Sequence, residues 1–177
     1  MKINLILNKA NNLLLVVMFL LFSCKKENIK YQHKILINNQ LNTDLLTNIK
    51  TPERVLLLGY LFVYGNECDE VSDRIKCEIL PKLNIDDECN TKHINQLKKW
   101  FKNDVILSLK LQKCPVLPRK FAIQNRIKKI ITQRNNDTIS ITIKVIGMNT
   151  SQEKNWNIEQ TDTFIIKNNS FIKVTKK

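Results

Sequence analysis

The chain offers few side chains for histidine-based or nucleophilic catalysis. Its 177 residues contain two histidines, His33 and His93, and three glycines. No Ser, His and Asp residues share a spacing that indicates a catalytic triad, and the GxSxG pattern is absent. Three glycines also exclude a Walker loop and a GxGxxG dinucleotide motif. We therefore predict no histidine catalyst and no cofactor, and we assign no catalytic residue.

Acidic residues are the remaining candidates for catalysis. They form two groups in the sequence, Glu67, Asp69, Glu70 and Asp73, followed by Asp86, Asp87 and Glu88. Paired carboxylates can share general acid and general base roles, so a small carboxylate-dependent hydrolase stays open as an alternative. Acidic residues are equally typical of loops and of the first turns of helices, where they need no catalytic role.

Part of the second acidic group resembles the alternate ligand positions of a calcium loop. The matching residues are Asn84, Asp86, Glu88 and Asn90. Such a loop requires Gly at its sixth position and Glu at its twelfth, where this chain has Cys89 and Asn95. We therefore predict no metal site.

The N-terminal segment has the features of an export signal. Lys2 and Lys9 make it basic, and an unbroken run of apolar residues follows from Leu13 to Phe22. A membrane-spanning helix needs about 20 apolar residues, whereas this shorter run matches the core of a signal peptide. The sequence predicts a cleaved leader over residues 1–23.

The end of the run, Leu21-Phe22-Ser23-Cys24, resembles the lipobox of bacterial lipoproteins. In that pattern an aliphatic residue, a tolerant position and a small residue precede the cysteine, and Phe22 is bulkier than the common choice. The resemblance implies cleavage before Cys24 and its modification by diacylglycerol and an acyl group such as palmitate, which together anchor a protein stably. Residue 25 is Lys and not the Asp linked with inner-membrane retention, which implies the outer membrane. The periplasmic face and the cell surface both stay open.

The other cysteines are even in number, which in an oxidising compartment predicts two disulfides. They are Cys68, Cys77, Cys89 and Cys114. Three pairings are possible, and we favour Cys68–Cys77 with Cys89–Cys114 because each closes a short segment. A zinc site is the alternative, but the chain has no CxxC pair to support it.

Positive charge is concentrated in one segment of this chain, whose formal net charge is +13. Residues 98–134 contain one acidic residue, Asp104, and the basic residues Lys98, Lys99, Lys102, Lys110, Lys113, Arg119, Lys120, Arg126, Lys128, Lys129 and Arg134. Nucleic acid commonly binds such a stretch, but export and the lack of interleaved stacking aromatics argue against it. For a lipid-anchored protein, an anionic component of the envelope is the natural partner. A lysine-rich solvated face is the alternative that needs no partner.

The first half of the mature chain has helical patterns. Thr51-Pro52-Glu53 is typical of a helix start, and the apolar run Val55–Tyr64 predicts a buried helix. A second helix is expected over Glu70–Leu80, with Pro81 as its end. The third, Thr91–Lys102, is amphipathic.

The second half changes to a period of two. Ile139, Ile141, Ile143 and Val145 alternate with polar residues and predict a half-buried strand. Another strand at about 121–133 precedes a turn at 135–137, and a hairpin is expected around 168–170. Trp156 lies in a polar, loop-like stretch. We predict an α+β fold in which N-terminal helices pack on a C-terminal antiparallel meander sheet. This element order resembles the cystatin-like and nuclear-transport-factor-like small exported domains.

These features predict a leader (1–23), a polar tether (24–34) and a single α+β domain (35–177). The function they favour is that of a lipid-anchored envelope protein, a non-enzymatic binding or interaction module attached to the bilayer through Cys24. Its partner would be an anionic envelope component or a protein. An immunity-type protein that blocks an envelope-acting toxin is the alternative.

Overall fold

The alternating isoleucines form the strand that the sequence predicts. The computed structural model describes residues 28–64, 74–85, 91–111 and 123–174. Within them, β4 (Thr138–Asn149) pairs along its whole length with β3 (Ile123–Asn135) on one side and β5 (Lys154–Lys167) on the other. β6 (Ser170–Lys173) completes the meander. Asparagines with positive φ occupy the β3–β4 turn, at Asn136, and the β5–β6 turn, at Asn168 and Asn169, as that residue type tolerates.

The sheet also contains a strand that the sequence interpretation missed. β1 (Lys30–Ile37) pairs antiparallel with β3, and the short β2 (Gln40–Leu41) pairs with β1. Residues 30–34, which we expected in the tether, therefore belong to the sheet. Their polar pattern concealed this, because a register shift between Lys34 and Leu36 interrupts the alternation and buries the consecutive Ile35 and Leu36.

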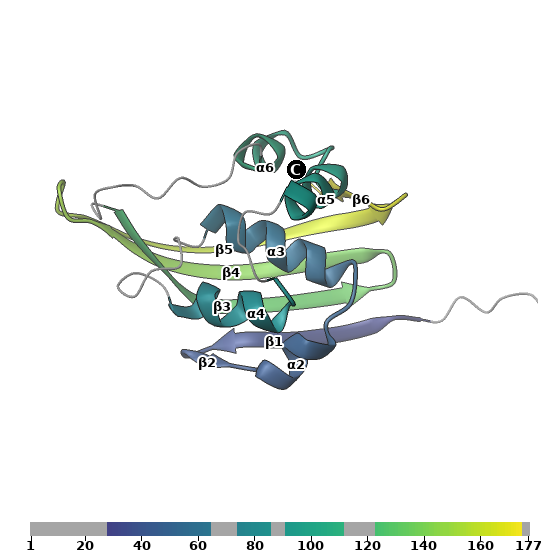
Figure 1. Cartoon of the computed structure of the whole chain (residues 1–177), viewed down its shortest axis with the longest axis horizontal. Helices are drawn as coiled ribbons and strands as arrows, with labels where there is room; N and C mark the ends of the chain where they lie inside the picture. The colour runs from purple at the N-terminus through teal and green to yellow at the C-terminus, as the bar shows by residue number, and fades with distance from the viewer. Residues whose placement is uncertain (1–27, 65–73, 86–90, 112–122, 175–177) are drawn as a thin grey trace, which may run out of the picture.

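All strand pairs are antiparallel, in the order β2-β1-β3-β4-β5-β6. Five helices in the described part of the chain cover one face of this sheet (Figure 1). They are α2 (Thr43–Asn48), α3 (Glu53–Tyr64), α4 (Arg74–Lys82), α5 (Thr91–Trp100) and α6 (Val105–Lys110). The predicted α+β fold, with helices packed on an antiparallel sheet, is confirmed.

The helices α3, α4 and α5 match the three that the sequence predicts. The short helices α2 and α6 were not predicted, because their sequences have no clear helical periodicity. Pro81, expected to end its helix, lies inside α4, one residue before its end. The short helices α2 and α6 are each capped by a side chain that accepts a hydrogen bond from a backbone N–H three residues on. The caps are Asn42, bound by the Leu45 amide, and Asp104, bound by the Leu107 amide, each at 3.0 Å.

The helix α3 lies at the centre of the core, as its apolar run predicts. Aromatic rings from β5, β6 and the end of α5 pack beneath it, and the ring of Phe101 lies 5.0 Å from that of Phe171 and 6.2 Å from that of Phe164, centroid to centroid. Gly59 allows Phe101 to approach α3, because a Cβ at this position would overlap the Phe101 ring. The lack of a side chain at Gly59 is therefore a packing requirement.

We predict that Gly59→Ala lowers the free energy of unfolding. Alanine is the better helix former by about 1 kcal/mol, but overpacking typically costs about 1–3 kcal/mol, so the steric term dominates. Denaturant unfolding of Gly59→Ala, Phe101→Leu and the double variant measures this. The double variant should regain part of the loss, because leucine removes the ring atoms that collide. Purely additive effects of the two changes would contradict this packing role.

Candidate functional site

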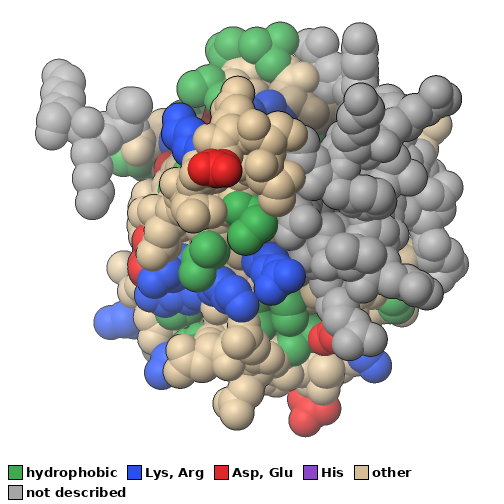
Figure 2. Space-filling view, turned by 90° about the vertical axis from the view of Figure 1, so that its left-hand side faces the viewer, with side chains coloured by type: hydrophobic (Ala, Val, Ile, Leu, Met, Phe, Trp, Pro, Cys, Tyr) green, Lys and Arg blue, Asp and Glu red, His purple; other side chains and the backbone are tan. Residues whose placement is uncertain are grey.

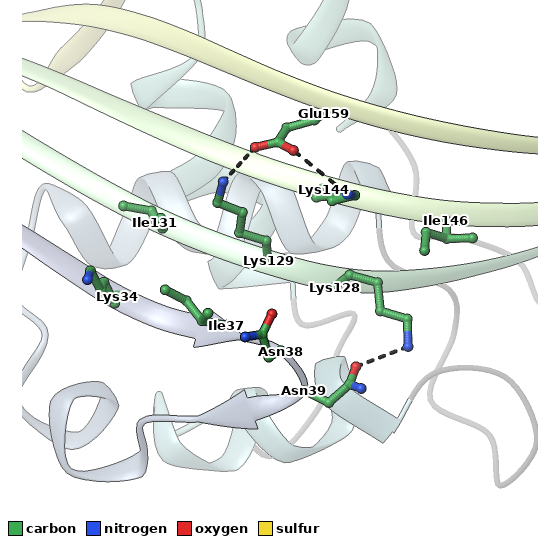
Figure 3. A pocket seen from close by; sticks show the side chains of 10 residues that line it. All are labelled: Lys34, Ile37, Asn38, Asn39, Lys128, Lys129, Ile131, Lys144, Ile146 and Glu159. Carbon is green, nitrogen blue, oxygen red and sulfur yellow. Dashed lines mark hydrogen bonds and ion pairs between the residues drawn. The ribbon is translucent and has the colours of Figure 1, made fainter.

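The face of the sheet opposite the helices carries a hollow lined by lysines. It measures about 730 Å³ and draws its side chains from β1, β3, β4 and β5 (Figure 3). We call it the lysine groove, lined by Lys34, Ile37, Asn38, Asn39, Lys128, Lys129, Ile131, Lys144, Ile146 and Glu159. A space-filling view from one end of the molecule shows Lys and Arg side chains gathered beside hydrophobic ones (Figure 2).

Strand register and one bulge place the lysines on this face. Lys129 pairs with Lys144, and Lys144 pairs with Glu159, so the three side chains form a row across β3, β4 and β5. The register of β3 shifts between Ile127 and Lys129, leaving Lys128 as the extra residue. Because of this bulge, two consecutive lysines line the same groove while Ile127 stays in the core at 1% exposure.

Polar contacts fix some of these side chains and leave a positive excess. Lys129 Nζ donates to Glu159 Oε1 at 2.6 Å, and Lys144 Nζ lies 3.9 Å from Glu159 Oε2. The hydrogen bond from Lys129 lowers the pKa of Glu159 below its usual value, with the charges of Lys129 and Lys144 acting in the same direction. Lys128 Nζ donates to Asn39 Oδ1 at 3.0 Å. Lys34 has no ion-pair partner among the described residues, so one carboxylate faces four ammonium groups.

The basic residues predicted from the sequence do not form one surface. Lys98 and Lys99 lie on α5, in the helical layer, and Lys102 follows that helix. Lys110 lies on α6, with Nζ 5.4 Å from the ring centroid of Tyr64.

Among the described members of that set, three residues of β3 lie on or near the groove. Lys128 and Lys129 line it, and Arg126 lines an adjoining hollow. Arg134 Nε instead donates to the backbone oxygen of Asn136 at 2.9 Å. Lys113, Arg119 and Lys120 lie outside the described residues.

Sequence reasoning missed two groove lysines. Lys144 is one of the polar residues that alternate with the isoleucines of Ile139–Val145, so the pattern predicts that it faces away from the core. It was missed because it lies outside the basic segment 98–134. Lys34 lay in the expected tether, and only the pairing of β1 with β3 brings it here. Charge density along the chain therefore could not identify the groove, since half of its lysines come from neighbouring strands.

A buried carboxylate ties α3 to the sheet on the opposite face. Glu53 is 2% exposed, its two oxygens each lie 2.9 Å from His33 Nδ1, and the Thr132 hydroxyl donates to it. The ring of Tyr31 stacks on His33 with centroids 4.2 Å apart. Burial raises the pKa of Tyr31 to about 12, and the Glu53 carboxylate adds to the shift while Arg134 opposes it. His33, expected in a tether, is thus part of the folded core's polar network.

A second polar network lies where the other end of α3 meets β5. Tyr60 donates to Asp162, whose other oxygen lies 3.0 Å from Lys173 Nζ. Tyr64 donates to Gln160 at 3.3 Å. Burial, followed by the hydrogen bond to Asp162, raises the pKa of Tyr60 well above its usual value. Both tyrosines therefore act as neutral hydrogen-bond donors that join α3 to β5.

Trp156 lies in β5 and not in a loop, which corrects the sequence interpretation. Its indole N–H donates to Asn125 Oδ1 at 3.0 Å, and it pairs across the strands with Gly147. A side chain at position 147 would overlap the Trp156 ring, so glycine makes room for it. The polar residues around Trp156 concealed the strand because they lie at its start, where they are largely exposed.

Other predicted site residues fall outside the described part of the chain. These are both acidic groups at 67–73 and 86–88, Cys24, and the cysteines Cys68, Cys89 and Cys114. Cys77 lies in α4 and is disulfide-bonded. Since its partner lies outside the described residues, the favoured pairing stays a prediction.

Comparison with known proteins identifies no relative. No protein-family model matches the chain, and neither the curated proteins nor the solved structures give a match. Among the described residues, no helix is long and apolar enough to cross a membrane, and no cluster of His, Cys, Asp and Glu has the form of a metal site.

We predict a pH dependence of stability that belongs to Tyr31. Its folded pKa of about 12 exceeds the unfolded value of about 10. The stability it contributes is therefore complete below about pH 10 and is lost as the pH rises towards 12. Urea unfolding of the parent and of Tyr31→Phe across this range measures the difference in unfolding free energy. The unfolding free energy of the parent should fall relative to that of Tyr31→Phe as the pH rises. A difference that stays constant with pH would contradict the assignment to Tyr31.

Proposed function

We propose that this protein is a lipid-anchored, non-enzymatic binding module of the cell envelope that holds an anionic partner in the lysine groove. The proposal is supported by the excess of four lysines over one glutamate on the sheet face opposite the described helices. Ammonium groups that are held close together repel one another, and an anion relieves this repulsion while gaining several attractive contacts. Lys34 and Lys144, at opposite sides of the groove, would contact such a ligand from two directions.

The proposed location follows from the lipobox resemblance at Leu21–Cys24 and places the module at the outer membrane. Five residues lie between Cys24 and Lys30, the first residue of β1, and these six residue steps span at most about 20 Å. An acylated Cys24 would therefore keep the domain near the bilayer, where anionic headgroups and envelope phosphates are abundant. Proximity of the domain to the bilayer supports a partner that belongs to the envelope.

We predict that Lys34→Gln/Lys144→Gln weakens the binding of a soluble polyanion. This pair is chosen because it leaves the Lys129–Glu159 ion pair and the Lys128–Asn39 hydrogen bond in place. Titration calorimetry with tripolyphosphate, using the lipidated protein in phosphatidylcholine nanodiscs, should show a dissociation constant raised about tenfold, as expected for the loss of roughly 1.4 kcal/mol.

The matched control is Lys98→Gln/Lys99→Gln, which removes the same charge from the exposed face of α5. It should leave the dissociation constant within about twofold of the parent, because exposed charges beyond the Debye length of roughly 8 Å are screened. An equal loss of affinity in the two variants would indicate attraction by net charge alone, and would refute a groove-specific site.

The anchor is tested independently of the groove. Cys24→Ser removes the sulfur that the lipobox resemblance assigns to diacylglycerol, so metabolic labelling with palmitate should disappear and the protein should leave the membrane fraction. Cys77→Ser serves as the control, because it removes a cysteine sulfur elsewhere in the chain and should keep the label. Persistent labelling of Cys24→Ser would refute the lipoprotein assignment.

A further inference from the structure

A second hollow adjoins the lysine groove along β4. It measures about 210 Å³ and shares Lys128 and Ile146 with the groove. Its other lining residues come from β3, β4 and β5 and are Arg126, Gly147, Met148 and Asn155. The two hollows therefore form a continuous surface on the sheet face opposite the described helices.

The character of this surface changes along one strand. Lys144, Ile146 and Met148 alternate along β4 and share its outer face, so a cation is followed by two apolar side chains. At about 3.3 Å per residue, these positions span roughly 13 Å. Ile146 is 41% exposed and Met148 is 43% exposed. Two neighbouring apolar side chains beside a row of ammonium groups are complementary to a ligand that is itself anionic at one end and apolar at the other.

We infer that the groove binds a single anionic amphiphile, with its charged head against Lys34, Lys129 and Lys144 and its alkyl chain along Ile146 and Met148. This inference rests on the proposed function and specifies its ligand. The head gains the charge-assisted contacts that the groove offers. The chain removes the exposed apolar surface of Ile146 and Met148 from water, which adds affinity that the head alone lacks.

The shape of the site favours a single molecule over the surface of a bilayer. The main hollow of about 730 Å³ lies within the usual volume range of small-molecule sites. The β1–β2 turn, with Asn38 and Asn39, borders it on one side. A planar bilayer meets protruding side chains, whereas a recess bordered by a turn receives a molecule that leaves the bilayer.

The test uses the lipidated protein in phosphatidylcholine nanodiscs and a photoreactive probe. The probe is a twelve-carbon alkyl phosphate with a diazirine near the end of its chain, and mass spectrometry locates the crosslinks. We expect labelling in residues 145–154. Excess dodecyl phosphate should reduce this labelling at least fivefold, whereas dodecyl maltoside, which has the same chain and no charge, should leave it within twofold.

Variants separate the head from the chain. Lys34→Gln/Lys144→Gln should reduce labelling at least fivefold. Met148→Gln, which is nearly isosteric, should reduce labelling at least threefold and leave tripolyphosphate binding unchanged. Leu109→Gln, on the exposed face of α6, is the matched control and should label like the parent.

The possible failures are distinguishable. In one outcome, tripolyphosphate binding depends on Lys34 and Lys144, but labelling is unchanged in Met148→Gln or is reduced equally by dodecyl maltoside. This outcome overturns the amphiphile as the ligand and keeps the proposed function. Equal labelling of all variants means that the probe reacts from the bilayer surface, which also overturns the amphiphile. Absence of both lysine-dependent tripolyphosphate binding and lysine-dependent labelling overturns the inference and the proposed function together.

Discussion

The register of β3 between β1 and β4 decides which side chains enter the core and which line the lysine groove. It directs Ile127 and Ile130 into the core and Lys129 and Ile131 to the opposite face. A register shift in the pairing of β1 with β3 and another in the pairing of β3 with β4 change which residues face the core and which face the groove. A slip by one residue would exchange the faces and bury the lysines. The groove and the core are therefore two consequences of the same pairing.

The helical layer and the groove share this sheet, and polar contacts fix how the layer sits on it. Glu53 joins the start of α3 to β1 and β3, and Tyr60 joins a later turn of α3 to β5. Buried hydrogen-bonded polar groups are costly to leave unpaired, which favours one arrangement of α3 over others. Because β1, β3 and β5 also supply Lys34, Lys129 and Glu159, the same contacts hold the groove-forming strands in place from the far side.

The sequence patterns were sufficient for the fold class and for much of the element order. The isoleucine alternation in β4 and the apolar run in α3 are strong signals. In each case the pattern of apolar residues in one continuous segment matches the pattern of burial in the element it forms. β1 escaped detection because a register shift breaks its period and its first half is polar. The groove escaped for a related reason: Lys34 and Lys129 are far apart in sequence, and only strand pairing brings them to one surface.

Locating a bound anion in a crystal would show directly whether the lysine groove is an anion site. Crystals of the mature protein soaked in tungstate, a tetrahedral dianion with strong anomalous scattering, would place it by its own signal. We expect an anomalous peak in the lysine groove, within contact distance of Lys34, Lys129 or Lys144, and no such peak in crystals of Lys34→Gln/Lys144→Gln. A peak beside Lys98 and Lys99 with an empty groove would contradict this expectation.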